Sequence, residues 1–479
     1  MNRRHALAGL AATATALTGY RLNAAEARDD VEIVRRALQL HPGLHRYATP
    51  SQVETRLGGL ARELGGADTL EARYLALSRF LATIRCGHTY GNFFNQKKAA
   101  TSALFDRPTR LPFHFAWMDG RMIVTGDPGR LGLPVGAEVS AINGVTARRL
   151  LPALLPYARA DGHNDAKRVS LLGVSGSDTI EYFDVFHGLV FGAPSDGVHR
   201  LSLQPLHRTG LLHVEAPAIG LAARRAQGGP APVDGDRPVW SWELRPDGVA
   251  VLTMPTWALY NSRWDWRAWL SERLDGLDGA RGLIIDLRDN EGGEDCGDLL
   301  LARLIDAPLA DPGAERRLRF RRTPADLDSY LDTWDQSFRT LGEAAEPIGG
   351  GFLRQVRAPA DGTIAPEGRR LNLRVAALIG PVNSSATFQF AQKGRRSGRV
   401  RLFGQATGGN LRGINGGCFF FVRLPHSGLE FDLPLIGYFP PGSPRDSGLR
   451  PDILVRPTPR TLDARLDPEK DAALAWLLT

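Results

Sequence analysis

The sequence of 479 residues predicts an α/β fold, because regions of three different characters follow one another along the chain. Apolar residues recur at helical spacing through residues 28–105, and short strands separated by turn signals fill residues 106–205. From residue 239 onward, apolar strands alternate with amphipathic helices, as in a parallel sheet covered by helices. We expect residues 206–238, which include a stretch rich in Ala, Gly, Arg and Pro, to form a linker, and residues 239–479 to form the core that carries the chemistry.

Composition excludes several classes of function. The hydrophobic content of 43% is that of an ordinary globular protein, and the net charge of +7 comes mostly from dispersed arginines. Because no run of basic residues with interleaved aromatics occurs, we expect no nucleic-acid binding. Cys86, Cys296 and Cys418 are widely spaced and lack a C-x-x-C motif, which argues against a zinc site and a disulfide framework, while one pair could still form a bridge. We expect no metal and no cofactor.

The N-terminus has the pattern of a targeting segment. A pair of arginines is followed by an apolar run of small residues, Ala6–Leu17, and then by the cleavage pattern Ala25-Glu26-Ala27. Paired arginines are typical of the twin-arginine export route. The run is too short to span a bilayer comfortably, and no other segment is long and apolar enough. We expect a signal peptide over residues 1–27, no stable membrane span, and an exported bacterial protein, periplasmic or extracellular.

The helical region leads into a candidate functional residue. A third helix is predicted over Leu70–Arg85, and Gly87 suits the left-handed position just beyond a helix. His88 follows at once, in the sequence GHTY. A lone histidine after a helix is more often structural than a general base, so both interpretations stay open at this point.

The β-rich region predicts a small binding module. Asp119 and Gly120 are expected at the tip of a hairpin. Further on, a Gly-x-x-Val strand ends in an Asn143-Gly144 turn, which is compatible with such a module.

Three apolar stretches are expected as parallel strands, namely Val249–Met254, Gly282–Leu287 and Arg374–Ile379. Parallel strands gather functional loops at their carboxyl ends. After the second strand, Gly292 and Gly293 allow the close backbone approach that an N–H donor to an oxyanion requires. An ordinary turn from strand to helix is the alternative.

The third strand is followed by a break at Gly380-Pro381 and then by Asn383, Ser384 and Ser385 ahead of a helix. A serine there lies at the carboxyl end of a strand and at the positive end of a helix, where free N–H groups favour negative charge. Ser385 is therefore the candidate nucleophile. Asn and Ser before a helix are also the commonest N-caps, so we expect one of these three residues only to cap it.

Three separated pieces of the sequence resemble one family in the same order: LIIDLRDNEGG, SSATFQFAQ with GQATGGN downstream, and SGLRPDILV. Together they resemble the tail-specific, or C-terminal processing, serine peptidases and their tricorn-core relatives, over about Val239–Pro459. The segments GHTY and GLPVGAEVSAINGV fit the upstream half of that family. The resemblance implies a ClpP/crotonase-like catalytic core, a degenerate PDZ-like module, and a serine-type peptidase acting on a peptide or protein.

The resemblance also assigns expected site residues. The nucleophile of the family is a serine followed by alanine, which matches Ser385 and Ala386. The oxyanion would then be held by the backbone N–H of Ala386 and by that of Gly292 or Gly293.

The sequence departs from the processing branch at the general base. That branch uses a lysine 25 residues after the serine, where this chain has Asn410. The tricorn-type branch uses a histidine ahead of the PDZ-like segment, and His88 stands in that place, so His88 becomes the expected base. A carboxylate near the final G-x-x-P-D motif orients that histidine in the family. Asp446 is the expected third member, one position from the usual place, with Glu291 or Asp289 as alternatives.

The expected function is hydrolysis of peptide bonds through an acyl-enzyme, without a metal. Two other classes remain open. The chain could be a catalytically inactive ligand- or peptide-binding protein on the same scaffold, or a hydrolase of non-peptide esters or amides. The oligomeric state does not follow from the sequence.

Overall fold

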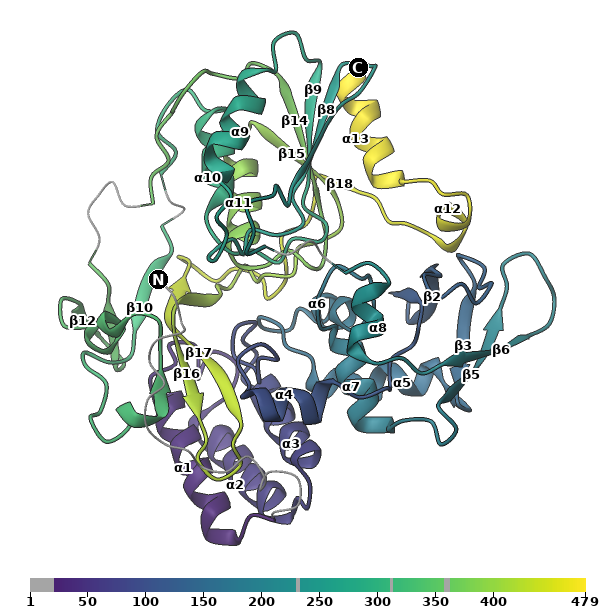
Figure 1. Cartoon of the computed structure of the whole chain (residues 1–479). Helices are drawn as coiled ribbons and strands as arrows, with labels where there is room; N and C mark the ends of the chain where they lie inside the picture. The colour runs from purple at the N-terminus through teal and green to yellow at the C-terminus, as the bar shows by residue number, and fades with distance from the viewer. Residues whose placement is uncertain (1–20, 230–232, 311–312, 357–361) are drawn as a thin grey trace.

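The computed structural model describes residues 21–229, 233–310, 313–356 and 362–479, and it has a mixed α/β architecture built around three sheets (Figure 1). Most of the expected signal peptide lies outside the described residues. The expected cleavage pattern at residues 25–27 falls in the first turn of helix α1, where Ala27 is buried. Within the described residues, no helix is long and apolar enough to cross a membrane.

Helices form the N-terminal region, as the spacing of its apolar residues predicts. Asn23 and Thr49 each form a capping box, and these fix the first residues of α1 and α2. The four helices are α1 (Ala24–Gln39), α2 (Pro50–Gly66), α3 (Leu70–Ala82) and α4 (Lys98–Phe105).

The end of the third helix differs from the prediction. Helix α3 ends at Ala82, and the residue with a left-handed backbone is Arg85 (φ 59°), so the predicted end at Gly87 is wrong. Gly87 is needed for another reason. Its N–H donates to Asp161 Oδ1 at 2.9 Å, and a Cβ on Gly87 would lie 2.8 Å from Asp161 Oδ2. A side chain here would displace that buried carboxylate.

An antiparallel sheet in the order β1-β2-β3-β5-β6, with β4 paired to β3, forms the next region. Asp119 and Gly120 both have positive φ between β1 and β2, as do Asn143 and Gly144 between β3 and β4. Both predicted turns are therefore confirmed, with the twist that two-residue hairpin loops require. The strands are β1 (His114–Met118), β2 (Arg121–Gly126), β3 (Glu138–Ile142), β4 (Val145–Thr146), β5 (Val198–Gln204) and β6 (Leu212–Pro217).

The expected linker over residues 206–238 is only partly a linker. Strand β6 pairs with β5 along its whole length, and the short helix α8 (Leu221–Ala226) buries Arg224 against Asp184 of α7 (Tyr182–Phe191). The alanine and arginine residues of this stretch therefore belong to a packed helix, which the composition alone did not predict. The region's remaining helices are α5 (Ala147–Leu154), the 3-10 turn Leu155–Tyr157 and α6 (Asp165–Leu171).

The core sheet has the order β18-β15-β14-β9-β8-β7, parallel except for β7. Along β14, Val375, Ala377 and Ile379 pack toward α9, α10 and α11, while Ala376 and Leu378 pack toward α13 on the other face (Figure 1). Burial on both faces explains why this strand is apolar without alternation. The strands are β7 (Ser241–Leu244), β8 (Val249–Thr253), β9 (Gly282–Asp286), β14 (Arg374–Ile379), β15 (Val400–Gly404) and β18 (Ile453–Leu454), and the helices are α9 (Trp266–Asp275), α10 (Cys296–Ala302), α11 (Ser385–Arg396), α12 (Pro459–Asp463) and α13 (Pro468–Leu478).

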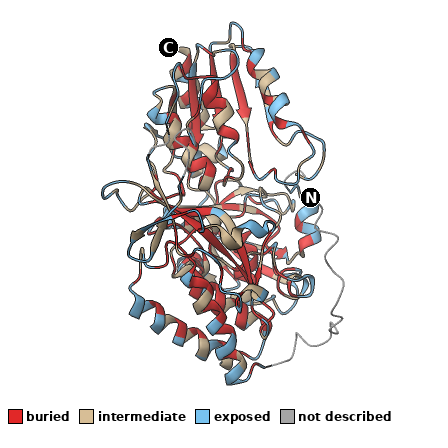
Figure 2. Cartoon of the chain, turned by 90° about the vertical axis from the view of Figure 1, so that its left-hand side faces the viewer, coloured by how far each residue is buried: buried red, intermediate tan, exposed pale blue. Residues whose placement is uncertain are grey.

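A third sheet, in the order β11-β16-β17-β10-β13-β12, lies beneath the core and joins it to the N-terminal helices. Phe420 and Phe431 of the β16–β17 hairpin share one hydrophobic cluster with Val34 and Leu77 of the helices. The C-terminal half of the chain thereby packs against its N-terminal helices. Figure 2 shows that buried segments, drawn in red, occur in both helices and strands. The strands are β10 (Glu315–Leu318), β11 (Leu331–Asp332), β12 (Glu346–Gly349), β13 (Phe352–Arg354), β16 (Asn415–Arg423) and β17 (Glu430–Phe439), with 3-10 turns at Asp328–Tyr330 and Gln336–Thr340.

Replacing Asp184 with alanine is expected to destabilise the protein by about 3–5 kcal/mol, because the buried guanidinium groups of Arg224 and Arg110 lose their anion. These groups lie 3.0 Å and 3.5 Å from Asp184 Oδ2. The control is Asp236→Ala, which removes an equally close pair with Arg263 whose side chains are both 73% exposed, and its effect should not exceed about 1 kcal/mol. Denaturant unfolding of both variants measures the difference, and equal losses would contradict a buried anchor in this segment.

Candidate active site

Ser385 is the first residue of α11, directly after the loop that follows β14. Its backbone is left-handed (φ 51°), a conformation that costs a non-glycine residue of order 1–3 kcal/mol and is concentrated at functional sites. The side chain is partly exposed. Ser384, the N-cap residue, makes no capping bond with its side chain, and its Oγ donates to Glu291 O at 3.1 Å instead.

The expected alternative, that one of the three polar residues merely caps α11, is not what the structure shows for Asn383 either. The side chain of Asn383 is fully buried. Its Oδ1 accepts from Gly380 N–H at 2.7 Å, while its Nδ2 donates to Leu287 O and, at 2.9 Å, to Asn290 O. Asn383 therefore fastens the loop after β14 to the loop after β9.

Gly292 of the β9 loop lies directly against the candidate nucleophile, and Gly293 lies against the backbone of Trp257. Gly292 and Gly293 have φ values of 117° and 140°, which only glycine adopts without strain. A Cβ on Gly292 would lie 2.9 Å from Ser385 Cβ and 3.1 Å from Ala386 N. Glycine is thus required for contact with Ser385, which an ordinary turn would not demand.

The hydrogen bonds distinguish between the expected oxyanion donors. Gly292 N–H already donates to Asn290 Oδ1 at 2.9 Å. No acceptor is found for Gly293 N–H in the part of the chain that the structure describes. Ala386 lies in the first turn of α11, where backbone N–H groups have no partner within the helix. The arrangement favours Gly293 and Ala386 over Gly292.

His88 approaches from the N-terminal region and contacts strand β16. Its Cε1 would lie 3.8 Å from a Cβ on Gly416, and its ring centroid lies 5.9 Å from that of Phe419. Burial, together with the positive charge of Arg159, lowers the pKa of His88 to about 4. His88 is therefore neutral at pH 7, the form that a general base requires. Glu291 acts on the pKa of His88 in the opposite sense.

Two buried cations, which the sequence did not single out, hold Glu291. Lys167 Nζ lies 2.6 Å and Arg159 Nη2 2.9 Å from Glu291 Oε1. Although burial raises it, these cations hold the pKa of the Glu291 carboxyl well below its usual range. Lys167 also donates to Val382 O at 2.7 Å, so it is the lysine that reaches the loop of Ser385, whereas Lys393 pairs with Asp298.

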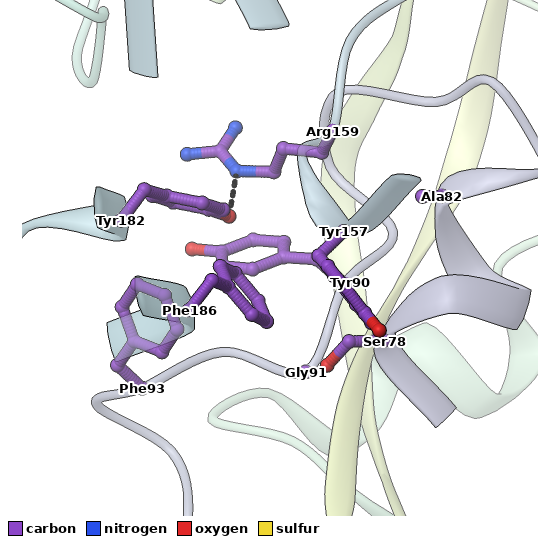
Figure 3. A pocket seen from close by; sticks show the side chains of 9 residues that line it. All are labelled: Ser78, Ala82, Tyr90, Gly91, Phe93, Tyr157, Arg159, Tyr182 and Phe186. Atoms are coloured by element: carbon purple, nitrogen blue, oxygen red, sulfur yellow. Dashed lines mark hydrogen bonds between the residues drawn. The ribbon is translucent and has the colours of Figure 1, made fainter. Parts of the chain in front are cut away.

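The aromatic surroundings of Arg159 fix its position. Its Nε donates to Tyr182 OH at 2.6 Å, and its guanidinium carbon lies 4.2 Å from the centre of the Tyr90 ring (Figure 3). Its Nη1 donates to Gly87 O, the carbonyl just before His88. Arg159 therefore links the Glu291 loop to the segment that carries His88. Spacing and composition gave no signal for Arg159 or Lys167, because both lie in the region expected to be a separate β-rich module.

The structure pairs Asp446 with a different histidine. Asp446 Oδ1 accepts from His163 N–H at 3.1 Å and from Asn410 Nδ2 at 2.7 Å, and its Oδ2 bonds to His163 Nδ1 at 2.5 Å. Both oxygens of Asp446 therefore have partners other than His88, and the role of Asp446 in orienting His88 stays a prediction. Asp289, the other alternative, is exposed.

One group of potential metal ligands occurs among the described residues. Cys86, His88 and Asp161 each offer one donor atom, and these atoms lie within 4.8 Å of one another. A cation bound there would occupy a lone pair of the imidazole, so it would oppose proton transfer at His88. All three cysteines are free.

The chain is similar to known proteins in part of its sequence and in its fold. Residues 248–455 match peptidase family S41. Among solved structures, mature CPAF complexed with lactacystin is similar with a TM-score of 0.63 at 17% identity, covering 95% of this chain and 99% of that chain. Mature CPAF gives a TM-score of 0.61 at 17% identity over 95% and 98% of the two chains. The photosystem II D1 C-terminal processing protease gives 0.40 at 13% identity over 90% and 92%. No curated protein sequence matches the chain.

The fold is shared with CPAF, and the class of protein is a serine-type peptidase. Within that class, residues 248–455 carry the match to peptidase family S41. The expected family and the α/β fold class are thus confirmed. The PDZ-like character of the β-rich region stays a prediction.

Replacing Asn383 with alanine is expected to lower the free energy of unfolding by about 2–4 kcal/mol, because buried groups on two loops lose their partners. Asn383→Asp is the matched variant. It keeps the acceptor for Gly380 N–H but turns an oxygen toward the two carbonyls that Nδ2 now satisfies, so it should destabilise at least as much. Thermal and denaturant unfolding measure both variants. Wild-type stability in either one would show that the two loops are held by other contacts.

Proposed function

We propose that this protein is an exported serine peptidase that cleaves peptide bonds through an acyl-enzyme on Ser385, with His88 as general base. The contact between Gly292 and Ser385 carries the proposal. It sets a left-handed serine at a helix start directly against Gly292, next to Gly293, for whose N–H no acceptor is found among the described residues. The N-terminal targeting pattern supports export.

The proposed chemistry assigns one step to each of these groups. His88 takes the proton of Ser385 as its oxygen attacks the scissile carbonyl carbon. The negative oxygen that forms is held by Ala386 N–H and Gly293 N–H, and one such donor lowers the barrier by about 2.7–4 kcal/mol. The imidazolium then gives its proton to the leaving amine. Water, activated by the same histidine, releases the second product and restores Ser385.

The substrates are peptides or proteins, and the β-rich region over residues 106–217 is the element that would hold the substrate beside the site. Through Arg159 and Lys167 it contributes side chains to the Glu291 loop, so it is connected to the catalytic loops and not tethered loosely. As in the family's PDZ-like modules, we propose that it receives the C-terminal end of the substrate.

Ser385→Ala is expected to abolish labelling by a fluorophosphonate probe, which forms a bond only with an activated hydroxyl. The matched control is Ser384→Ala. Ser384 is the neighbouring residue, but its hydroxyl is directed to Glu291 O, so labelling should persist in this variant. Gel fluorescence and intact mass measure the adduct. Absence of labelling in the wild type would favour an inactive binding protein, and loss only in Ser384→Ala would move the nucleophile by one residue.

His88→Ala is expected to lower kcat/KM by about 10²–10⁴-fold, the usual contribution of a general base. His163→Ala is the control, because His163 is the histidine paired with Asp446 and its side chain is 58% exposed. Its kcat/KM should stay close to the wild-type value. Peptide and ester substrates assayed in parallel also tell a peptidase from a hydrolase of non-peptide bonds. If only His163→Ala inactivated the enzyme, the general base would be His163 and not His88.

A further inference from the structure

A general base needs a partner that fixes its orientation and tautomer, and the structure leaves His88 without one. His88 Nδ1 is buried and has no hydrogen-bond partner among the described residues. Buried polar atoms are nearly always satisfied, so an unpaired nitrogen on a candidate catalytic residue calls for a cause.

A second buried and unpaired atom lies close by. Asp161 is only 2% exposed, and its Oδ2 has no partner within the described part of the chain. A ring nitrogen of His88 and a carboxylate oxygen of Asp161 lie within 4.8 Å of each other. A small side-chain rotation or a single bridging water spans such a separation.

The other carboxylates near His88 are already engaged. Glu291 is held by Arg159 and Lys167, and Asp446 by His163 and Asn410. Asp289, the remaining alternative, is exposed, whereas Asp161 is buried and keeps one oxygen unpaired among the described residues.

We propose that Asp161 is the positioning residue of His88, replacing the carboxylate that the family supplies from the end of the chain. This inference rests on the proposed function. The surrounding structure is built for it. Gly87 N–H donates to Asp161 Oδ1, which leaves Oδ2 for the imidazole, and the missing side chain of Gly87 makes the space that Oδ2 occupies. Asn410 Nδ2 donates to Asp161 O at 3.0 Å and fixes the backbone.

The chemistry is that of an orienting acid. His88 Nδ1–H donates to the Asp161 carboxylate, so the lone pair of Nε2 is presented to the Ser385 hydroxyl. When His88 takes the proton, the negative carboxylate stabilises the imidazolium. Burial raises the pKa of Asp161 to about 6, against the lowering effect of the Gly87 N–H and of the Arg46 charge, so Asp161 is ionised at pH 7.

The other charged and titratable groups around His88 set the background against which Asp161 acts. Arg159 and Lys167 lower the pKa of His88, and Glu291 raises it. Burial raises the pKa of the Cys86 thiol to about 11, so this neighbour is neutral at physiological pH. Burial also raises the pKa of Asp178 to about 6 and that of Asp432 to about 7, so a step near pH 6 is assigned to Asp161 only by its loss in Asp161→Asn.

The test is the pH profile of kcat for Asp161→Asn. In the wild type, kcat should fall as the pH drops through about 6, because neutral Asp161 no longer stabilises the imidazolium. In Asp161→Asn, kcat at neutral pH should be about 10²–10⁴-fold lower, with little change in KM, and the step near pH 6 should be absent. A purely structural role would lower kcat or stability without removing that step.

Two further variants keep the result decisive. Asp446→Asn should retain the step, because its oxygens serve His163. If Asp161→Asn fails to fold, Gly87→Ala provides the test. It keeps the Asp161 and His88 side chains but displaces the Asp161 carboxylate, so it should reduce kcat. The proposal would be overturned by an unchanged pH profile in Asp161→Asn or by loss of the step in Asp446→Asn. It would also be overturned if a chelator removed the step, which would indicate a metal bound at Cys86, His88 and Asp161. Fluorophosphonate labelling of the wild type separates the two failures. A labelled Ser385 with an unchanged Asp161→Asn profile refutes only this inference.

Discussion

The buried hydrogen bonds of Asn383 are the constraint on which the site depends. They join the loops after β14 and β9, two neighbouring parallel strands whose carboxyl ends meet at one edge of the sheet. With these loops held together, Gly292 lies against Ser385, whose backbone is left-handed. The strain of this backbone, of order 1–3 kcal/mol, is offset by the hydrogen bonds of Asn383, which are stronger because the side chain is fully buried.

The second requirement is that a residue from the first fifth of the chain reaches this edge. The β16–β17 hairpin meets this requirement, because its Phe420 and Phe431 are buried among the N-terminal helices. His88, in the segment after helix α3, therefore lies against Gly416 of strand β16. The hairpin that contacts the proposed base thus shares a hydrophobic core with the N-terminal helices. Binding of the base to its site is inseparable from folding of the N-terminal helices, because that core would otherwise be exposed.

The fold and half of the site could be predicted from the sequence, and the reasons differ by residue. Ser385, Gly292 and Gly293 follow strands whose apolar patterns are local, so their meeting at one sheet edge is a consequence of parallel topology. Arg159, Lys167 and Asp161 could not be found in this way. They are charged residues in a stretch without periodicity. Arg159 and Lys167 are buried against Glu291, which lies 132 and 124 positions further along the chain, and Asp161 is buried close to His88. No local pattern in the sequence predicts such contacts. Gly87 was noticed for the wrong reason, since its lack of a side chain serves a carboxylate and not a helix end.

The electrostatics of the site favour a histidine over a lysine as base. Lys167 reaches the Ser385 loop, but its ammonium is paired with Glu291 and donates to Val382 O, and to act as a base it would have to give up both interactions. His88 needs no such loss. Burial, together with the positive charges of Arg159 and Lys167, keeps the imidazole neutral before the reaction, against the opposing effect of Glu291. In a buried site these charges act with little screening. An anion beside Nδ1 is therefore what would allow the imidazolium to form during the reaction.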